Sequence, residues 1–292
     1  MQIEEGKIES SSFPQEPRRI FFWEGILFFL TLILGILTSW KILRIPGIEL
    51  QKIPLRPSSL WEILFSFASG LLIVLLIIRF LKFRPGKEIL FKAFFVLPVF
   101  LGGTLFWGLW IGDIFALVLI LVFLIWWLKK PNVLLHNFLL ISGMIGIGSV
   151  FGLRLDPLLV IAILIIFSIY DFIAVYKTKH MIKLAKEMVE ARAISGIILP
   201  QNLSELQVSL ENVKIGGRFL ILGGGDIVFP LILVSSIVPT GILNSLIVAI
   251  FATIGLLGSI WIFLSQKTRK PIPALPSIAF FSIIGYLITK VL

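Results

Sequence analysis

The chain has 292 residues, of which 58% are hydrophobic and 14% are charged, and its net charge is +10. Soluble domains contain about 25% charged residues, so this composition indicates a protein that resides in a lipid bilayer. The absence of cysteine excludes disulfides and cysteine nucleophiles, and His136 and His180 form no HExxH motif. We therefore expect no metal and no other cofactor. The basic residues flank apolar segments, which favours a role in membrane orientation over nucleic-acid binding.

Apolar segments of membrane-spanning length follow a polar tail, residues 1–20, which we expect to be flexible and cytoplasmic. A spanning helix needs about 20 apolar residues. By this criterion the sequence predicts an all-α polytopic membrane protein with nine transmembrane helices, five within residues 21–154 and four within residues 155–292. Their approximate ranges are 21–43, 60–81, 89–110, 112–128, 134–153, 157–178, 219–238, 241–264 and 272–291.

The distribution of lysine and arginine predicts the orientation of these helices. With the amino terminus inside, the inner segments carry 20 of these residues and the outer segments carry 6. Cytoplasmic flanks of membrane helices are enriched in basic residues. We therefore expect a multi-pass protein of the cell membrane, with its amino terminus in the cytoplasm and its carboxyl terminus outside.

One long connection, near residues 180–218, is expected to form a cytoplasmic loop. Its first part, HMIKLAKEMVEARAI, has the spacing of an amphipathic helix at the membrane surface. Its last part, VKIGGRFLIL, is rich in glycine and β-branched residues and is typical of extended backbone. Gly148 and Gly152, in GIGSVFG, are instead typical of close packing between helices.

Of the 16 acidic residues, only Asp171 and Asp226 lie well inside predicted spans. An ionisable residue there costs about 2.5–3.5 kcal/mol to insert and therefore indicates a functional site. Each lies eight residues from a basic residue at the cytoplasmic boundary, which places it about 12 Å below that boundary at about 1.5 Å per residue. Because consecutive spans are often neighbours, we expect the two carboxyl groups to face each other and to share one proton. The ionised member can then accept a proton from water while the protonated member polarises a carbonyl group.

Three glycines, Gly223 to Gly225, precede Asp226 in the sequence GGGD. Glycine costs about 1 kcal/mol in a helix interior relative to alanine, so this run should fray the start of the seventh span. Glycine also permits close approach of another backbone. We expect extended backbone before Asp226 to pair with an unwound peptide by strand addition.

Three motifs together resemble the signatures of the presenilin and signal peptide peptidase family, and they occur in the family's order. They are Tyr170-Asp171 in SIYDFIAVY, GGGD as the family's GxGD, and PALP at Pro273 to Pro276. The resemblance covers residues 160–292 well, whereas the first five spans match in number only. The predicted orientation is most similar to that of archaeal presenilin homologues. The resemblance implies an intramembrane aspartyl protease that cleaves peptide bonds within transmembrane segments.

By the same resemblance, Asp171 and Asp226 would form the catalytic pair. The residues implied to bind substrate or to shape the active site are Tyr170, Gly223, Gly224, Gly225, Pro273, Ala274 and Leu275. Presenilins commonly have leucine at the position of Gly224, which the family links to substrate preference. The resemblance also implies substrates that are transmembrane helices with an external amino terminus, and it implies no obligate partner subunit.

Two other functions use the same residue types. A proton-coupled transporter or cation pathway would use the two aspartates as a relay, although the sequence shows no inverted repeat. A prepilin-type peptidase also uses GxGD with a second aspartate, usually followed by lysine, whereas IVFP follows here. A rhomboid-type serine protease is excluded because no GxSG motif is present.

Overall fold

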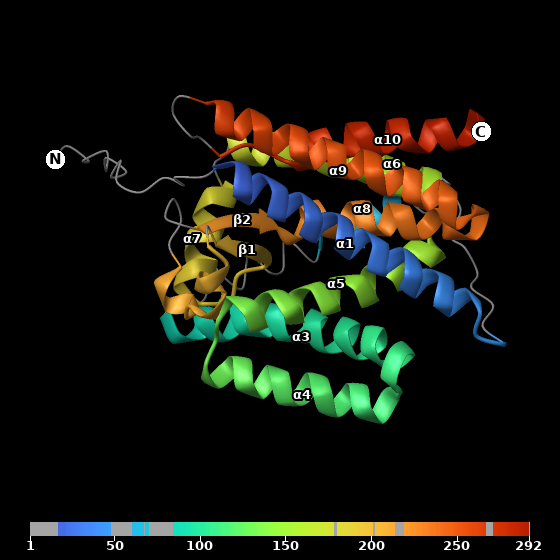
Figure 1. Cartoon of the computed structure of the whole chain (residues 1–292). Helices are drawn as coiled ribbons and strands as arrows, with labels where there is room; N and C mark the ends of the chain where they lie inside the picture. The colour runs from blue at the N-terminus through green and yellow to red at the C-terminus, as the bar shows by residue number, and fades with distance from the viewer. Residues whose placement is uncertain are drawn as a thin grey trace.

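The computed structural model describes residues 17–47, 60–66, 68–69, 84–177, 180–200, 202–213, 219–266 and 271–291. Its helices are α1 (Pro17–Leu43), α3 (Arg84–Ile111), α4 (Asp113–Lys129), α5 (Val133–Arg154), α6 (Pro157–Tyr176), α7 (His180–Glu190), α8 (Gly224–Ile237), α9 (Ile242–Ser265) and α10 (Leu275–Val291). Two strands, β1 (Gly196–Pro200) and β2 (Phe219–Gly223), form a small sheet, and the short 3-10 helices are η1 (Leu203–Gln207), η2 (Leu210–Asn212) and η3 (Val238–Thr240). Figure 1 shows the helices as a bundle of roughly parallel rods.

The prediction of a polytopic helical membrane protein is confirmed. Among the described residues, five helices are long and apolar enough to cross a membrane: Phe22–Leu43, Glu88–Ile111, Val133–Arg154, Pro157–Tyr176 and Ile242–Ser265. Two shorter apolar helices cover Gly224–Thr240 and Leu275–Val291. The predicted second span, 60–81, lies mostly outside the described residues, and its first part, 60–66, is helical.

The first helix begins earlier than expected. It starts at Pro17, inside the segment predicted as a flexible tail, and the rest of that tail lies outside the described residues. Proline is favoured at the first helical position because its φ suits the helix and its missing N–H would have no partner there.

The predicted seventh span, 219–238, is wrong at its start, because residues 219–223 form a strand and not a helix. This strand, β2, pairs antiparallel with β1 in the register Gly196↔Gly223 and Pro200↔Phe219. The extended conformation expected before Asp226 is therefore confirmed for the described residues 219–222. The glycine run does not interrupt a helix. It forms the junction between a strand and α8 instead.

The connection between α6 and α8 contains the predicted amphipathic segment as helix α7. The strand β1 that follows is buried, with Ile197 and Ile198 no more than 1% exposed. This part of the connection therefore folds into the protein interior. The reason is its apolar sequence GIILP, which pairs with β2.

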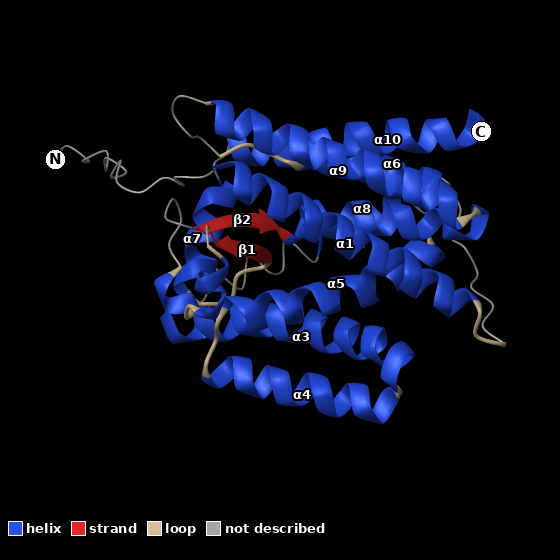
Figure 2. Ribbon diagram, viewed as in Figure 1, coloured by secondary structure: helices blue, strands red, loops and turns tan. Residues whose placement is uncertain are grey.

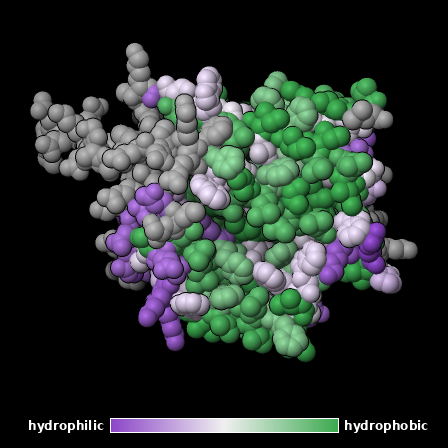
Figure 3. Space-filling view, viewed as in Figure 1, coloured by the Kyte–Doolittle hydropathy of each residue, from purple (hydrophilic) through white to green (hydrophobic). Residues whose placement is uncertain are grey.

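Helix α8 lies at the centre of the bundle, where α1, α5, α6, α9 and α10 pack around it, while α3 and α4 lie outside α5 (Figure 1). The two strands lie at one end of the bundle, near the start of α1 (Figure 2). The predicted close packing at Gly148 and Gly152 is confirmed, since a Cβ at Gly148 would lie 2.5 Å from Leu231 Cδ2 and one at Gly152 would collide with Ser235. Outside the bundle, Figure 3 shows a broad apolar surface over the helices with hydrophilic residues toward the ends, as expected for a protein surrounded by lipid.

Candidate active site

Helix α6 presents Asp171 to the protein interior. The helix begins at a cap in which the Asp156 carboxylate accepts the Leu158 N–H at 2.8 Å, followed by Pro157 in the first turn. Its buried residues recur at helical spacing as Val160, Ile163, Leu164, Phe167, Asp171 and Ala174. Asp171 continues this stripe and is 7% exposed. The adjacent Tyr170 faces outward and is 42% exposed.

Helix α8 presents Asp226 from its first turn, directly after β2. The backbone N–H of Gly223, the residue before the helix, interacts with the Asp226 carboxyl group. An acidic residue three positions into a helix commonly satisfies this N–H. A Cβ at Gly223 would lie 3.1 Å from Asp226 Oδ2, so the glycine leaves room for the carboxyl group.

The structure brings the two aspartates together at one level of the bundle. The rings of Phe167 and Phe229 stack between α6 and α8 with centroids 4.6 Å apart. Asp171 lies one turn after Phe167, and Asp226 lies one turn before Phe229. Because α6 and α8 are antiparallel in this bundle (Figure 1), both aspartates lie on the same side of the stacked rings. Their carboxyl groups are close enough to interact electrostatically.

The PAL segment contacts both acids. Its Pro273 is buried and its Ala274 is partly buried, and α10 begins at Leu275. The Leu275 backbone N–H interacts with the carboxyl groups of Asp171 and Asp226. This agrees with the expectation that a proline-broken helix start approaches the two aspartates.

Contacts from two neighbouring helices fix this helix start. The Leu275 carbonyl accepts the Ser168 hydroxyl of α6 at 3.5 Å, and Ser277 Oγ donates to the Gly255 carbonyl of α9 at 2.8 Å. Sequence reasoning missed Ser168, although its position three residues before Asp171 places it on an adjacent part of the same helix face.

The remaining two glycines differ in their surroundings. The Gly224 N–H donates to the Ser195 carbonyl at 2.9 Å, and a Cβ at Gly224 would lie 2.8 Å from that oxygen and 2.9 Å from Met144 Cε. Gly225 is exposed, and a Cβ there would contact only Phe229, at 3.6 Å. Gly224 therefore joins α8 to the chain before β1, whereas Gly225 leaves open space beside Asp226.

The edge of β1 that faces away from β2 is occupied by side chains of α5. Asn137 Nδ2 donates to the Ile198 carbonyl at 2.7 Å, and Asn137 Oδ1 accepts the Ile198 N–H at 2.9 Å. His136 Nε2 lies 3.2 Å from the Gly196 carbonyl oxygen. The backbone groups of Ile198 thus point away from β2. Ile221 lies opposite Ile198, and directly opposed residues of an antiparallel pair either both bond each other or both point outward. The N–H and C=O of Ile221 therefore point away from β1.

A third carboxyl group, Glu24 of α1, lies near Asp226, whereas the sequence alone singled out only the two aspartates. Glu24 is 2% exposed and interacts electrostatically with Asp226. Its position near the predicted start of the first span concealed it, since α1 begins at Pro17 rather than near residue 21. In the part of the chain that the structure describes, no three acidic or histidine side chains are placed to bind one metal ion.

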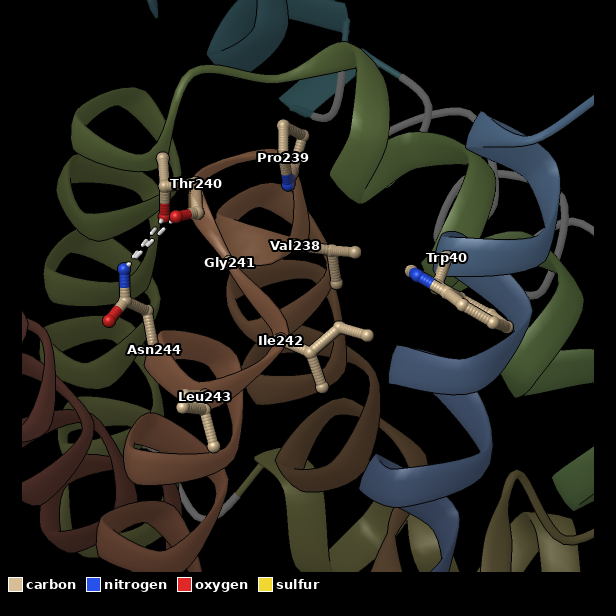
Figure 4. Close-up of a pocket in the computed structure, with 8 residues that line it drawn as sticks. All are labelled: Trp40, Val238, Pro239, Thr240, Gly241, Ile242, Leu243 and Asn244. Carbon is tan, nitrogen blue, oxygen red and sulfur yellow. Dashed lines mark hydrogen bonds between the residues drawn. The ribbon is translucent and has the colours of Figure 1, made fainter.

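An open hollow of 530 Å³ lies at the other end of α8, lined by Trp40 and residues 238–244 (Figure 4). Thr240 and Asn244 line one side of it, where the Asn244 amide donates to Thr240. Val238 is 12 residues from Asp226, which corresponds to about 18 Å along a helix. The hollow is therefore separate from the acid cluster.

Comparisons with known proteins agree with this arrangement. A sequence profile of the family described as "Signal-peptide peptidase, presenilin aspartyl protease" matches residues 26–292. Two solved structures of presenilin family intramembrane aspartate proteases have the same fold. One, in space group C222, aligns with a TM-score of 0.64 and 18% identity over 93% of this chain and 98% of that one. The other, in space group P2, aligns with a TM-score of 0.54 and 19% identity over 91% of this chain and 96% of that one.

A search of curated proteins found no match. The family profile covers nearly the whole chain, including all three motifs that surround the acid cluster. The chain therefore belongs to the signal peptide peptidase and presenilin family of intramembrane aspartyl proteases.

Proposed function

We propose that Asp171 and Asp226 are the catalytic pair of this protease. The observation that supports this assignment is the placement of both carboxyl groups against one backbone N–H, that of Leu275. The ionised aspartate accepts a proton from water, and the resulting hydroxide attacks the peptide carbonyl carbon. The protonated aspartate donates its proton to the carbonyl oxygen, and collapse of the tetrahedral intermediate transfers a proton to the leaving amine. No covalent intermediate with the enzyme is formed.

Substrates of this chain are transmembrane helices, which must unwind because a scissile carbonyl within a helix is already hydrogen-bonded. We propose that the unwound segment adds as a strand to the edge of β2 that faces away from β1. The other edge of the sheet is occupied by Asn137 and His136, whereas Ile221 directs its backbone groups outward. Main-chain hydrogen bonding then holds the extended peptide beside Asp226, which follows β2 by three residues.

The finer features of the membrane arrangement belong to the same proposal. We propose nine transmembrane helices in the cell membrane, with a cytoplasmic amino terminus, an external carboxyl terminus and no obligate partner subunit. The excess of basic residues on the predicted inner segments supports this orientation. Tyr170, Gly225, Pro273 and Ala274 would shape the substrate path around the two aspartates.

Replacement of each aspartate by asparagine tests the catalytic assignment. Asp171→Asn and Asp226→Asn are each expected to lower the rate of cleavage of a transmembrane substrate by at least about 100-fold, because neither amide can exchange a proton with water or substrate. The measurement is cleavage by purified variants in liposomes. The two proteins should remain folded, since asparagine preserves the side-chain volume.

Asp113→Asn is the matched control, because Asp113 is an exposed residue in the first turn of α4. It should cleave as the wild type does. Substantial cleavage by either Asp171→Asn or Asp226→Asn would contradict the assignment. Proton flux across liposomes that depends on the aspartates, without cleavage, would favour the transporter function instead.

A further inference from the structure

Glu24 is a buried acid that the catalytic pair does not account for. It is 2% exposed, and its Oε2 atom has no hydrogen-bond partner among the described residues. A buried carboxylate without compensation is costly, and Glu24 lies seven residues into α1, or about 10 Å along the helix. A chain that needed only apolar packing here would carry an aliphatic residue.

The packing of α1 directs Glu24 toward the catalytic pair. At Gly25 the helix meets α9 closely, where a Cβ would lie 2.8 Å from Leu257 Cδ2. Further along, Gly35 lies against Leu231 of α8, and its carbonyl accepts the Ser149 hydroxyl of α5 at 3.2 Å. Helix α1 is thus held between α5, α8 and α9, with Glu24 at the end of the bundle where α8 begins.

Among the ionisable side chains described on the elements that contact α1, Asp226 of α8 is the one that interacts with Glu24. Helix α9, strand β1 and helix η3 carry no ionisable residue. The described ionisable side chains of α5 and α3 have other partners or lie elsewhere. On α5, His136 contacts β1 and Arg154 lies at the opposite end of the helix. On α3, Lys92 forms an ion pair with Glu88. Asp171 interacts in turn with Asp226.

We propose that Glu24 is a positioning residue that acts through Asp226, forming with the two aspartates a chain of three carboxyl groups whose protons are shared. This inference rests on the proposed catalytic pair. Two adjacent carboxyl groups in a low-dielectric site resist ionising together. A negative charge on Glu24 therefore disfavours loss of the one proton that Asp171 and Asp226 share, and this proton is needed to polarise the substrate carbonyl. Glu24 thus widens the pH range over which the two aspartates hold one proton.

The pH dependence of cleavage tests this role. Because the catalytic pair needs one proton, the wild-type rate should fall on both sides of an optimum. In Glu24→Gln the like charge beside Asp226 is removed, so the proton leaves the pair more easily. The alkaline limb of the profile should move to lower pH by about one unit, while Glu24→Asp should retain most of the wild-type profile.

The matched control is Thr38→Val, which removes a buried polar group of the same helix whose hydroxyl bonds the Leu34 carbonyl. Thr38→Val should leave the pH profile in place, because it changes only packing and a neutral hydrogen bond. If Glu24 had a role in packing alone, Glu24→Gln would likewise leave the profile in place. A Glu24→Gln profile that superimposes on the wild type would overturn the inference, while inactive Asp171→Asn and Asp226→Asn variants would still support the catalytic pair.

A second measurement covers the possibility that Glu24→Gln does not fold. Infrared spectra of the full-length protein labelled with ¹³C-glutamate separate a protonated buried glutamic acid from the aspartates. In Asp226→Asn the pH at which this glutamic acid band disappears should move, whereas in Asp113→Asn it should not. An unchanged band in Asp226→Asn would also overturn the proposed proton sharing.

Discussion

At the scale of single residues, the acid cluster is tolerated in an apolar bundle because backbone groups and small residues compensate its cost. Gly223 and Leu275 direct N–H groups at the carboxyl groups, and Gly223 leaves space for Asp226 Oδ2. A hydrogen bond to a charged group contributes about 1.5–3 kcal/mol, similar to the insertion cost of one aspartate, about 2.5–3.5 kcal/mol. The three glycines appear equivalent in the sequence but have different surroundings: Gly223 lies beside the Asp226 carboxyl group, Gly224 packs against Ser195, and Gly225 is exposed.

Gly224 is predicted to be a packing requirement. Gly224→Ala is expected to lower the free energy of unfolding by about 1–3 kcal/mol, because the new Cβ would lie 2.8 Å from the Ser195 carbonyl oxygen, which cannot rotate away. Gly225→Ala is the control, since its nearest contact would be 3.6 Å, from Phe229. Thermal unfolding of both purified proteins in detergent measures the difference. Equal stability of the two variants would contradict the prediction, because it would mean that the backbone at Ser195 moves away from the new Cβ without cost.

At the scale of elements, the small sheet is the part of the fold that the proposed strand addition uses. Strand β1 is held on one side by β2 and on the other by Asn137 of α5. Among the described residues, Asn137 thus occupies the outer edge of β1, and the proposed strand addition uses the outer edge of β2, whose chain leads directly into Asp226. In the proposed function, this arrangement couples the register of an added strand to the position of Asp226.

The outward N–H of Ile221 is predicted to bind substrate. Proline is tolerated where a strand N–H faces away from its partner, so Ile221→Pro should fold normally. It should cleave about two- to tenfold more slowly than Ile221→Ala, the range expected for one backbone hydrogen bond of about 0.5–1.5 kcal/mol. Cleavage rates of the two purified variants provide the test.

Leu220→Pro provides the contrast within the same strand. Leu220 pairs with Leu199, and alternation directs its N–H toward β1. This variant should lose stability, because a bond inside the sheet is removed. Equal cleavage by Ile221→Pro and Ile221→Ala would exclude strand addition at this edge.

At the scale of the whole molecule, the bundle surrounds the central helix α8 on several sides, so Asp226 is enclosed by segments far apart in the sequence. Glu24, Asp171 and Leu275 come from α1, α6 and α10, respectively. Asp226 lies in the first turn of α8, directly after β2, and Asp171 interacts with it. The sheet lies at one end of the bundle (Figure 2), so the acids lie toward that end. The proposed orientation places this end toward the cytoplasm.

The absence of cysteine from the chain allows this orientation to be measured directly. Lys130→Cys lies in a predicted inner segment and Arg154→Cys in a predicted outer segment. A membrane-impermeant maleimide added to intact cells should therefore label Arg154→Cys and not Lys130→Cys. After permeabilisation both should react. The reverse pattern would mean that the protein is inverted in the membrane and that its substrates have the opposite orientation.

The sequence by itself determined the membrane class and most of the helices, and it singled out the two aspartates as candidates, because these features depend on local composition. Runs of about 20 apolar residues form helices in lipid wherever they occur, and an acid within such a run is conspicuous. The sequence also predicted extended backbone before Asp226 from the residue types of VKIGGRFLIL.

Only the tertiary structure decided which groups meet the aspartates. Strand β1 is buried in a connection expected to be a cytoplasmic loop, and it pairs with β2 through contacts more than 18 residues apart. Residues 219–222 carried two conflicting predictions, the start of the seventh span and extended backbone, and pairing with β1 decided for the strand. Glu24 was missed because its depth depends on where α1 begins, and its contact with Asp226 spans about 200 residues of sequence. Proximity of this kind arises from packing between distant segments, which no local pattern encodes.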